Sequence, residues 1–149
     1  MTPEQIASLG KLGGTAALGL SAVGSALGAG VAAQAAVGAW KKCYAQNKLA
    51  PFMLVAFIGV PLTQTIYGFI VLLQIVASAG KGAPAEALLG AGVFGGMAIG
   101  FSAWQQGKAA AAASDALAET GQGMANYFIA LGVIETVALF VLAFVQKAI

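Results

Sequence analysis

The sequence predicts an all-α membrane protein in which four transmembrane helices form two tandem helical hairpins. Of the 149 residues, 60% are hydrophobic and 8% are charged, and the mean hydropathy is +0.89, whereas soluble domains carry about 25% charged residues. Four apolar runs have the roughly twenty residues that cross a hydrocarbon core about 30 Å thick. These runs cover residues 12–39, 51–78, 87–110 and 125–146. They divide the chain into a first hairpin, residues 1–80, and a second, residues 81–149.

The two hairpins have the pattern of an internal duplication. A shift of 71 residues places Thr65 on Thr136 and Gln64 on Glu135. The first and third runs are rich in small residues four apart, which lets helix backbones approach closely. These residues are Gly24, Gly28 and Ala32 in the first run, and Gly92, Gly96 and Gly100 in the third. The second and fourth runs are bulky, so small and bulky helices alternate along the chain.

The first helix is expected to have Thr2 as its N-cap and to run almost to Trp40. Pro3 suits the first helical position, and Gln5 completes a capping box with Thr2. After a short polar turn, Pro51 is expected to open the second helix.

Pro61 lies inside the second run, where it removes one helical hydrogen bond and bends the helix. Such a break leaves a backbone carbonyl without its helical partner, and neighbours or a ligand can satisfy it. In the third run, the alanines at 109–113 favour a continued helix. Asp115 and Glu119 are expected in the loop that follows, as solvated charges.

The net charge of +2 comes from residues near the ends of the runs, so no nucleic-acid partner is implied. Loops 1–2 and 3–4 are expected in the cytoplasm, because more lysines lie near them than at the opposite membrane face. Near these loops are Lys41, Lys42, Lys48 and Lys108, whereas Lys11, Lys81 and Lys147 lie on the other side. Cys43 is the only cysteine, so no internal disulfide can form.

Glu135 is the only carboxylate deep inside an apolar run. A charged side chain at the bilayer centre costs about 2.5–3.5 kcal/mol on insertion scales, so it indicates a functional site with partners nearby. The expected partners are Thr63, Gln64 and Tyr67, which share a helix face with Val60 at spacings i, i+3, i+4 and i+7. Gln106 is a fourth, because it lies almost as far from the centre of its loop as Glu135 does.

These side chains offer the oxygens that a hard monovalent cation such as Na⁺ prefers. The hydroxyl of Thr63, the amide oxygens of Gln64 and Gln106, one oxygen of Glu135 and a carbonyl near Pro61 form the expected ligand set. Tyr67 is expected to donate to the other carboxylate oxygen. A bound sodium ion or a proton on Glu135 would make the site neutral. The alternative is that the polar residues only join helices by hydrogen bonds. Gln34 is expected to be a relic of the duplication or a packing contact, and not a ligand.

At these positions the chain resembles the K (or c, proteolipid) subunit of V-type rotary ATPases, in its prokaryotic duplicated-hairpin form. The resemblance covers essentially the full length and is carried by three motifs and by the repeat. The motifs are Pro61–Gly68, Gln106–Lys108 and Glu135–Thr136. In sodium-pumping members, the positions that match Thr63, Gln64, Gln106 and Glu135 supply ion ligands, as does the backbone carbonyl before the proline. That carbonyl belongs to Val60 here, and the tyrosine of the family corresponds to Tyr67.

The resemblance implies a rotor ring of many copies in a prokaryotic cell membrane, each carrying Na⁺, or alternatively H⁺ only, on one glutamate. The small-residue helices would line the inside and the bulky helices would face outward. Implied partners are other copies, a stator subunit with a basic residue, a central-stalk subunit at the cytoplasmic loops, and membrane lipid. The subunit is not an enzyme by itself, because ATP hydrolysis belongs to other subunits and the chain has no phosphate-binding glycine loop. Two rival functions are a passive oligomeric channel and a structural four-helix scaffold.

Overall fold

The computed structural model describes all 149 residues and contains helices and turns but no strand. Its elements are α1 (Pro3–Ala45), α2 (Leu54–Gly59), η1 (Val60–Leu62), α3 (Thr63–Gly80), α4 (Ala85–Thr120) and α5 (Met124–Val145). Because α2, η1 and α3 follow one another without a gap, they make one interrupted helix. Four helical units are therefore long and apolar enough to cross a membrane. The predicted fold class, all-α with four spanning helices, is confirmed.

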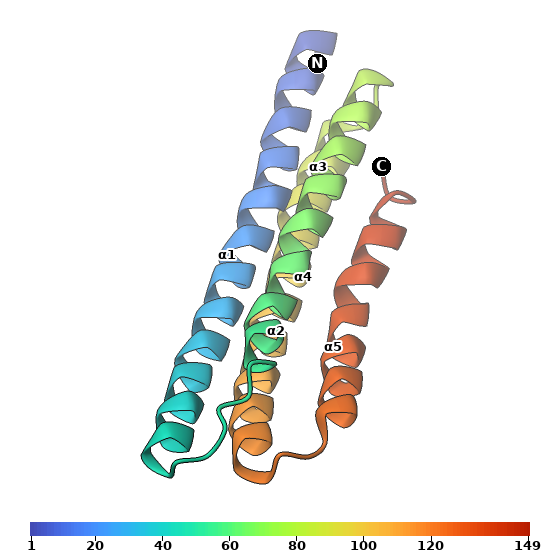
Figure 1. Ribbon diagram of the computed structural model, residues 1–149. Coiled ribbons are helices and arrows are strands. Elements are labelled where there is room, and N and C mark those ends of the chain that lie inside the picture. The colour runs from blue at the N-terminus through green and yellow to red at the C-terminus, as the bar shows by residue number, and fades with distance from the viewer.

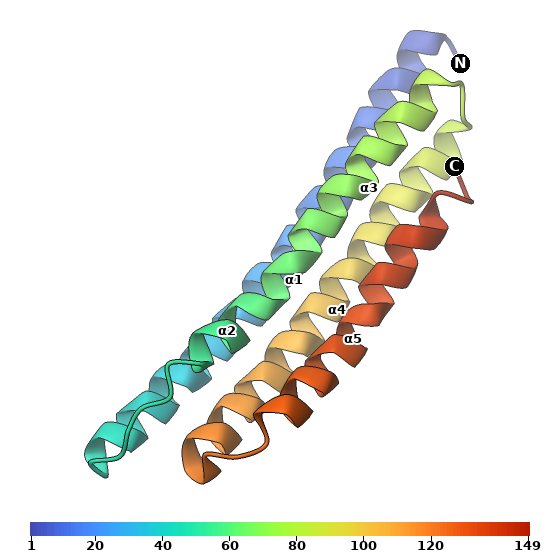
Figure 2. The same cartoon turned by 45° about the vertical axis from the view of Figure 1, so that its right-hand side comes forward.

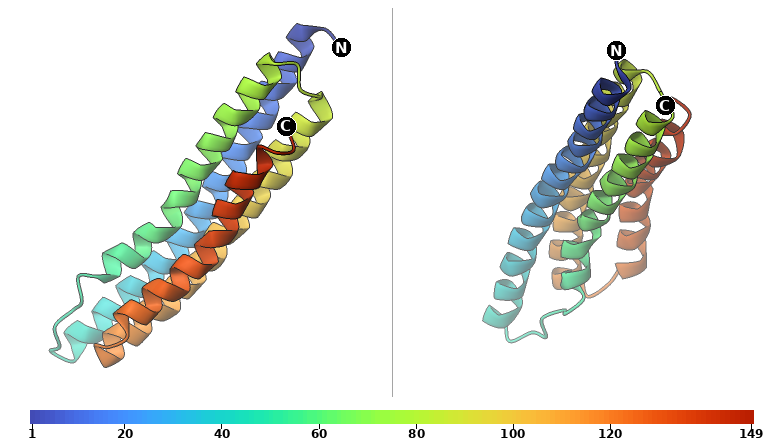
Figure 3. Two further views of the ribbon diagram at one scale, coloured as in Figure 1. Left: turned by 90° about the vertical axis from the view of Figure 1, so that its right-hand side faces the viewer. Right: turned by 90° about the horizontal axis from the view of Figure 1, so that it is seen from above.

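The four units lie side by side as two antiparallel hairpins (Figures 1 and 2). Both chain ends and the turn between α3 and α4 lie at one end of the bundle, and the connections 46–53 and 121–123 lie at the other. We call these the terminal end and the loop end. The view from above in Figure 3 shows α1 and α5 on opposite sides of the bundle, with α3 and α4 between them.

Helices α1 and α4 run parallel and pack on each other through glycines. A Cβ atom built on Gly92 would overlap the backbone of Gly13, and one built on Gly24 would overlap the backbone of Gly100. Gly13 faces Gly92 and Gly24 faces Gly100, so residue numbers rise in the same direction along both helices. The small residues predicted to allow close approach therefore pack against each other. Gly68 of α3 also lies close to α1, because an added Cβ would lie 2.6 Å from the Cβ of Ser21.

The capping box at the start of α1 is confirmed. The backbone N–H of Gln5 donates to Thr2 Oγ1 at 3.3 Å, and the backbone N–H of Thr2 donates to Gln5 Oε1 at 2.8 Å. The expected start of the second helix at Pro51 is wrong, because this helix begins at Leu54. The carbonyl of Pro51 instead accepts a hydrogen bond from Trp40 Nε1 at 2.8 Å, which holds the connection against the end of α1.

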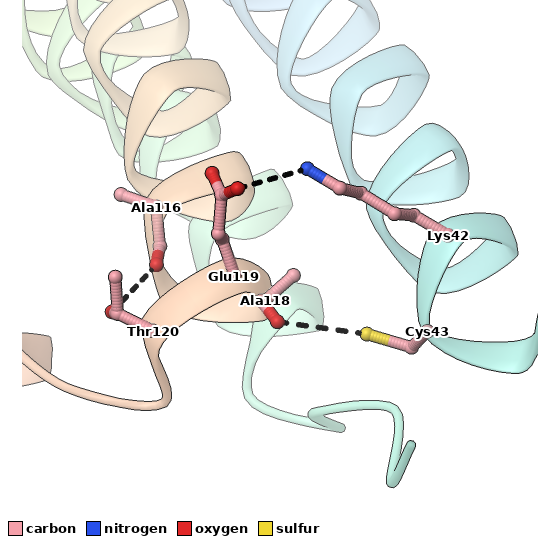
Figure 4. A network of polar contacts seen from close by, with 6 residues as sticks. All are labelled: Lys42, Cys43, Ala116, Ala118, Glu119 and Thr120. Carbon is pink, nitrogen blue, oxygen red and sulfur yellow. Dashed lines mark hydrogen bonds and ion pairs between the residues drawn. The ribbon is translucent and has the colours of Figure 1, made fainter. Parts of the chain in front are cut away.

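The placement of Asp115 and Glu119 in a loop is also wrong. Both residues lie within α4, which continues to Thr120 because its small and apolar side chains pack on the end of α1. Figure 4 shows this contact at the loop end, where Lys42 Nζ lies 3.5 Å from Glu119 Oε1. Asp115 and Glu119 are exposed, as expected, so the ion pair contributes at most about 1 kcal/mol. Both helices thus extend beyond the length that a bilayer requires.

The interruption by Pro61 takes the form of a single 3₁₀ turn, η1. The backbone N–H of Thr63 closes this turn on the carbonyl of Val60. Tightening from an α-helical to a 3₁₀ turn is a usual response to a missing donor. The turn directly precedes Thr63 and Gln64, so the predicted local distortion lies beside the predicted site.

Helix α5 is the least covered element of the bundle. Its only buried residues are Leu131 and Ala138, and its bulky side chains, such as Ile129, Val133 and Phe144, are exposed. An apolar helix with so little protein around it requires lipid or another chain as its surroundings.

The α1–α4 contact makes a prediction about stability. Gly24→Ala should lower the midpoint of thermal unfolding in detergent by several degrees, because the new methyl group overlaps the facing backbone and overpacking costs about 1–3 kcal/mol. Gly30→Ala is the matched control, because nothing lies within 4 Å of a Cβ at that position and alanine is the better helix former. Equal midpoints for the two variants would contradict the close packing.

Candidate functional site

Glu135 lies close to the middle of α5, which runs from Met124 to Val145 over 22 residues. At 1.5 Å per residue the helix is about 33 Å long, which matches the thickness of a hydrocarbon core. The side chain is half-buried and faces α3 and α4. The carboxyl group is therefore held at mid-membrane depth, inside the bundle's own contacts.

Three neutral side chains donate hydrogen bonds to this carboxyl group. Tyr67 Oη donates to Glu135 Oε1 at 2.6 Å, and Thr63 Oγ1 donates to the same oxygen at 2.8 Å. Gln106 Nε2 donates to Oε2 at 3.2 Å. The equal depth of Gln106 and Glu135, expected from their distances to the loop, is thus observed. The only ion pair in the structure joins Lys42 to Glu119, so no cationic side chain balances Glu135.

The two glutamines are fully buried and joined to each other. Gln64 Nε2 donates to Gln106 Oε1 at 2.7 Å, and Gln106 Nε2 also donates to the carbonyl of Leu131 at 3.0 Å. Gln106 therefore presents its nitrogen, and not its oxygen, to Glu135, in contrast to the expected ligand arrangement. The amide orientation follows from the hydrogen-bond network, and a half-turn of the amide exchanges the two atoms.

Thr63 has more acceptors around it than it can satisfy. Its Oγ1 lies 3.0 Å from the carbonyl oxygen of Val60, 3.1 Å from Gln64 Oε1 and 2.8 Å from Glu135 Oε1. A hydroxyl group has one proton to donate. The Thr63 hydroxyl oxygen and these three acceptor oxygens thus share the single proton of the Thr63 hydroxyl. The only other side-chain hydroxyl that donates to this group is that of Tyr67, which donates to Glu135 Oε1. Such an excess of acceptors is the environment that a cation or an additional proton stabilises.

The local sequence explains why these oxygens meet. Thr63, Gln64 and Tyr67 start α3 on one helix face, and the 3₁₀ turn before them keeps the Val60 carbonyl beside the Thr63 hydroxyl. Tyr67 and Thr63 both donate to Glu135 Oε1. The expectation that Tyr67 holds the carboxylate oxygen that does not bind the ion stays a prediction. All six predicted residues are brought together.

Ser102 is a contact that the sequence interpretation missed. This residue is 6% exposed, and its Oγ donates to the carbonyl of Ile134 at 3.0 Å. Together with the Gln106–Leu131 hydrogen bond, it joins α4 to the backbone of α5 in the turn that precedes Glu135. A signal was present, since Ser102 precedes Gln106 by four residues and so lies on the same helix face.

Two polar residues lie outside the site. Gln34, which a shift of 72 residues places on Gln106 and which is not expected to be a ligand, is exposed on α1 and has no hydrogen bond to another side chain. Thr136 turns back to its own helix, where its Oγ1 donates to the carbonyl of Val133 at 2.6 Å. Neither residue contacts the carboxyl group of Glu135.

A comparison with protein families agrees with this architecture. Residues 89–145 match the family model of the ATP synthase C subunit. The match covers almost all of α4 and all of α5, and therefore includes Gln106 and Glu135. The second hairpin is therefore similar to the ATP synthase C subunit. No curated protein matches the sequence significantly.

The buried glutamine pair makes a second prediction. Gln64→Leu should lower the thermal midpoint of the protein in a sodium-free buffer, because Gln106 Oε1 loses its donor and an unsatisfied buried acceptor costs about 1–3 kcal/mol. Gln34→Leu removes a glutamine of the same chemistry from an exposed position and should leave the midpoint unchanged. A Gln64→Leu midpoint equal to that of the unsubstituted protein would show that the pair contributes nothing.

Proposed function

We propose that this protein is the ion-carrying rotor subunit of a V-type rotary ATPase, and that each copy carries one Na⁺ ion on Glu135. The observation that carries the proposal is a mid-membrane carboxyl group with hydrogen-bond donors but no cationic side chain nearby. An ionised carboxylate in that position is costly. A reversibly bound cation removes this cost and explains why the residue is present.

The oxygens around Thr63 favour Na⁺ over other cargo. Hard cations bind oxygens at about 2.4 Å, so ligands at right angles lie about 3.4 Å apart. The oxygens of Val60, Gln64 and Glu135 lie 2.8–3.1 Å from the Thr63 hydroxyl, so small outward shifts would admit such an ion. We infer that Gln106 then turns its amide oxygen toward the ion and completes the set. Tyr67 would remain bound to the carboxylate and close the site.

Proton transport is the alternative cargo for the same site. A protonated Glu135 can donate to the Thr63 hydroxyl, which can in turn donate to Val60 or Gln64. This arrangement also leaves the site neutral. A proton engages fewer of the oxygens around Thr63 than a sodium ion would. We therefore propose Na⁺ as the cargo in preference to H⁺.

The shape of the chain suits a ring of copies. Helices α1 and α4 are slim and packed together, whereas the apolar surface of α5 is largely uncovered. In the proposed ring, α1 and α4 line the inside, and α3 and α5 face outward with Glu135. A stator subunit with a basic residue would attract the ionised carboxylate and release the ion. A central-stalk subunit would contact the loop end, which we place in the cytoplasm of a prokaryotic cell.

One carboxylate in four helices has an energetic consequence. Moving one charge against a membrane potential costs about 2.3 kcal/mol per 100 mV. A ring with few charges per turn moves fewer ions for each ATP hydrolysed elsewhere in the complex. The free energy available per ion is then larger, which favours pumping against a steep gradient.

Binding of radioactive sodium-22 to the purified protein tests the proposal. We expect one ion per chain in the unsubstituted protein and none in Glu135→Gln. Thr63→Val should weaken binding about tenfold or more, because it removes a ligand at the centre of the oxygen cluster. Thr136→Val is the matched control and should bind normally, since Thr136 contacts only its own helix. Absence of saturable sodium binding would leave proton transport as the function of the site.

Modification of Glu135 by a hydrophobic carbodiimide supplies a second test. The reagent should label Glu135 and stop ATP-driven transport by the complex, and Na⁺ should slow the labelling because it occupies the carboxylate. Labelling that Na⁺ does not slow at high pH would argue for the proton. Conduction by the purified protein without partners would favour the passive channel, and normal transport by Glu135→Gln would favour the scaffold.

A further inference from the structure

Ser25 of α1 carries a buried hydroxyl group that makes no hydrogen bond. The residue is 2% exposed, and its Oγ is inaccessible and has no partner in the protein. Other buried serines are satisfied, since Ser21 and Ser114 each donate to the carbonyl four residues earlier in their own helix. A buried hydroxyl without a partner is costly. We therefore expect Ser25 to find its partner in another state of the protein.

The packing of α1 on α3 places Ser25 opposite Gln64. The two helices are antiparallel neighbours (Figure 2), and a Cβ built on Gly68 would meet the side chain of Ser21. One turn further along α1 is Ser25, and one turn back along α3 is Gln64. Residues four apart lie on the same face of a helix, so the register continues from the first pair to the second.

Both buried glutamines lie near this level of the bundle. A Cβ built on Gly28 would meet both Pro61 and Ala103, so α1, the broken helix and α4 come together there. Ser25 precedes Gly28 by three residues, and Gln64 follows Pro61 by three. Because these two segments run in opposite directions, Ser25 lies at the depth of Gln64. Gly28 also faces the residue that follows Gln106, since a Cβ on Gly107 would overlap its backbone.

The sodium-bound state described above removes the hydrogen-bond acceptor of Gln64. Without the ion, Gln64 Nε2 donates to Gln106 Oε1 at 2.7 Å. When Gln106 turns its amide oxygen toward the ion, its nitrogen takes the place of that oxygen, and two donors face each other. Gln64 cannot correct this by a half-turn of its own, because its Oε1 is an expected ligand of the ion. Its nitrogen therefore needs another acceptor.

We propose that Ser25 is a positioning residue of the sodium site, whose hydroxyl oxygen accepts the hydrogen bond from Gln64 Nε2 when the ion is bound. This inference rests on the proposed function, because it is the bound sodium ion that turns Gln106. A hydroxyl oxygen has two lone pairs to accept with. The proton of Ser25 can turn to a carbonyl of the preceding turn, as the proton of Ser21 does. Ser25 thus holds Gln64 Oε1 on the ion without touching the ion.

Thermal unfolding in detergent with and without Na⁺, combined with sodium-22 binding, tests the proposal. Ser25→Ala should leave the sodium-free midpoint unchanged or higher, because the hydroxyl that it removes has no partner in that state. The same change should weaken sodium binding about tenfold, because the bound state then contains an unpaired amide N–H. The rise of the midpoint that Na⁺ produces should shrink accordingly.

Two further variants separate the hydrogen bond from packing. Ser25→Cys keeps the approximate size of the side chain, but sulfur is a weak acceptor, so sodium binding should weaken as in Ser25→Ala. Ser21→Ala is the matched control and should bind sodium normally, because the Ser21 hydroxyl is fully buried one turn earlier and already donates to its own helix.

Three results would overturn the proposal. Normal sodium binding by Ser25→Ala would show that Gln64 does not need this acceptor. A lower sodium-free midpoint of Ser25→Ala would make Ser25 a packing residue of the bundle. Normal binding by Ser25→Cys beside weak binding by Ser25→Ala would show that the volume of the side chain matters and not its oxygen. Absence of sodium binding by the unsubstituted protein is a different failure, because it contradicts the proposed function before any variant is compared.

Discussion

The charge of Glu135 must be balanced in the middle of a helix that has no basic residue within reach. Its three hydrogen bonds come from the neutral side chains of Tyr67, Thr63 and Gln106. Hydrogen bonds between membrane helices are worth about 0.6–2 kcal/mol each, so three of them lower the insertion cost of an ionised group but leave its charge unbalanced. In the proposed function, a bound cation or proton supplies that balance. The helix broken at Pro61 and the buried glutamines both contribute to stabilising the carboxyl group of Glu135 within the bundle.

The α1–α4 contact holds the elements of the site in place. Glycine against glycine brings two backbones so close that neither helix can slide without a collision. Gln106 belongs to α4, and Gly68, one residue after Tyr67, packs against Ser21 of α1. The close packing of α1 and α4 therefore fixes the positions of both the hydroxyl groups of α3 and the amide group of α4.

Much of the fold can be predicted because its determinants are local. The capping box of Thr2 and Gln5, the four apolar runs and the glycine spacings each need only neighbouring residues to be recognised. The predicted end of α4 is wrong because Asp115 and Glu119 indicate a loop by their charge, whereas the packing of α4 on α1 decides the helix end. The predicted helix start at Pro51 is wrong because the Pro51 carbonyl accepts a hydrogen bond from Trp40. This contact depends on how the connection between the helices folds, which local sequence does not specify.

The candidate site divides in the same way. The face shared by Thr63, Gln64 and Tyr67 follows from helix periodicity, and the link to Glu135 follows from the cost of a buried charge. The spacing of Ser102 and Gln106 places them on one face of α4, but it identifies neither the hydrogen-bond partner of Ser102 nor the orientation of the Gln106 amide, because both depend on the distance and rotation between α4 and α5. Sequence spacing constrains one helix at a time, whereas these contacts are set between helices.

The sparse cover of α5 has a mechanical consequence. The helix is joined to α4 by a short connection with two glycines, Gly121 and Gly123, at φ angles of +67° and +85° that favour glycine. Beyond that connection only two of its side chains are buried, and side-chain hydrogen bonds near Glu135 hold its middle. Beyond its middle, the helix is held only by partly buried apolar side chains, Val141, Leu142 and Val145, which pack against the core. Any group that competes for the central hydrogen bonds would therefore loosen the middle of α5 and leave the contact between α1 and α4 unchanged.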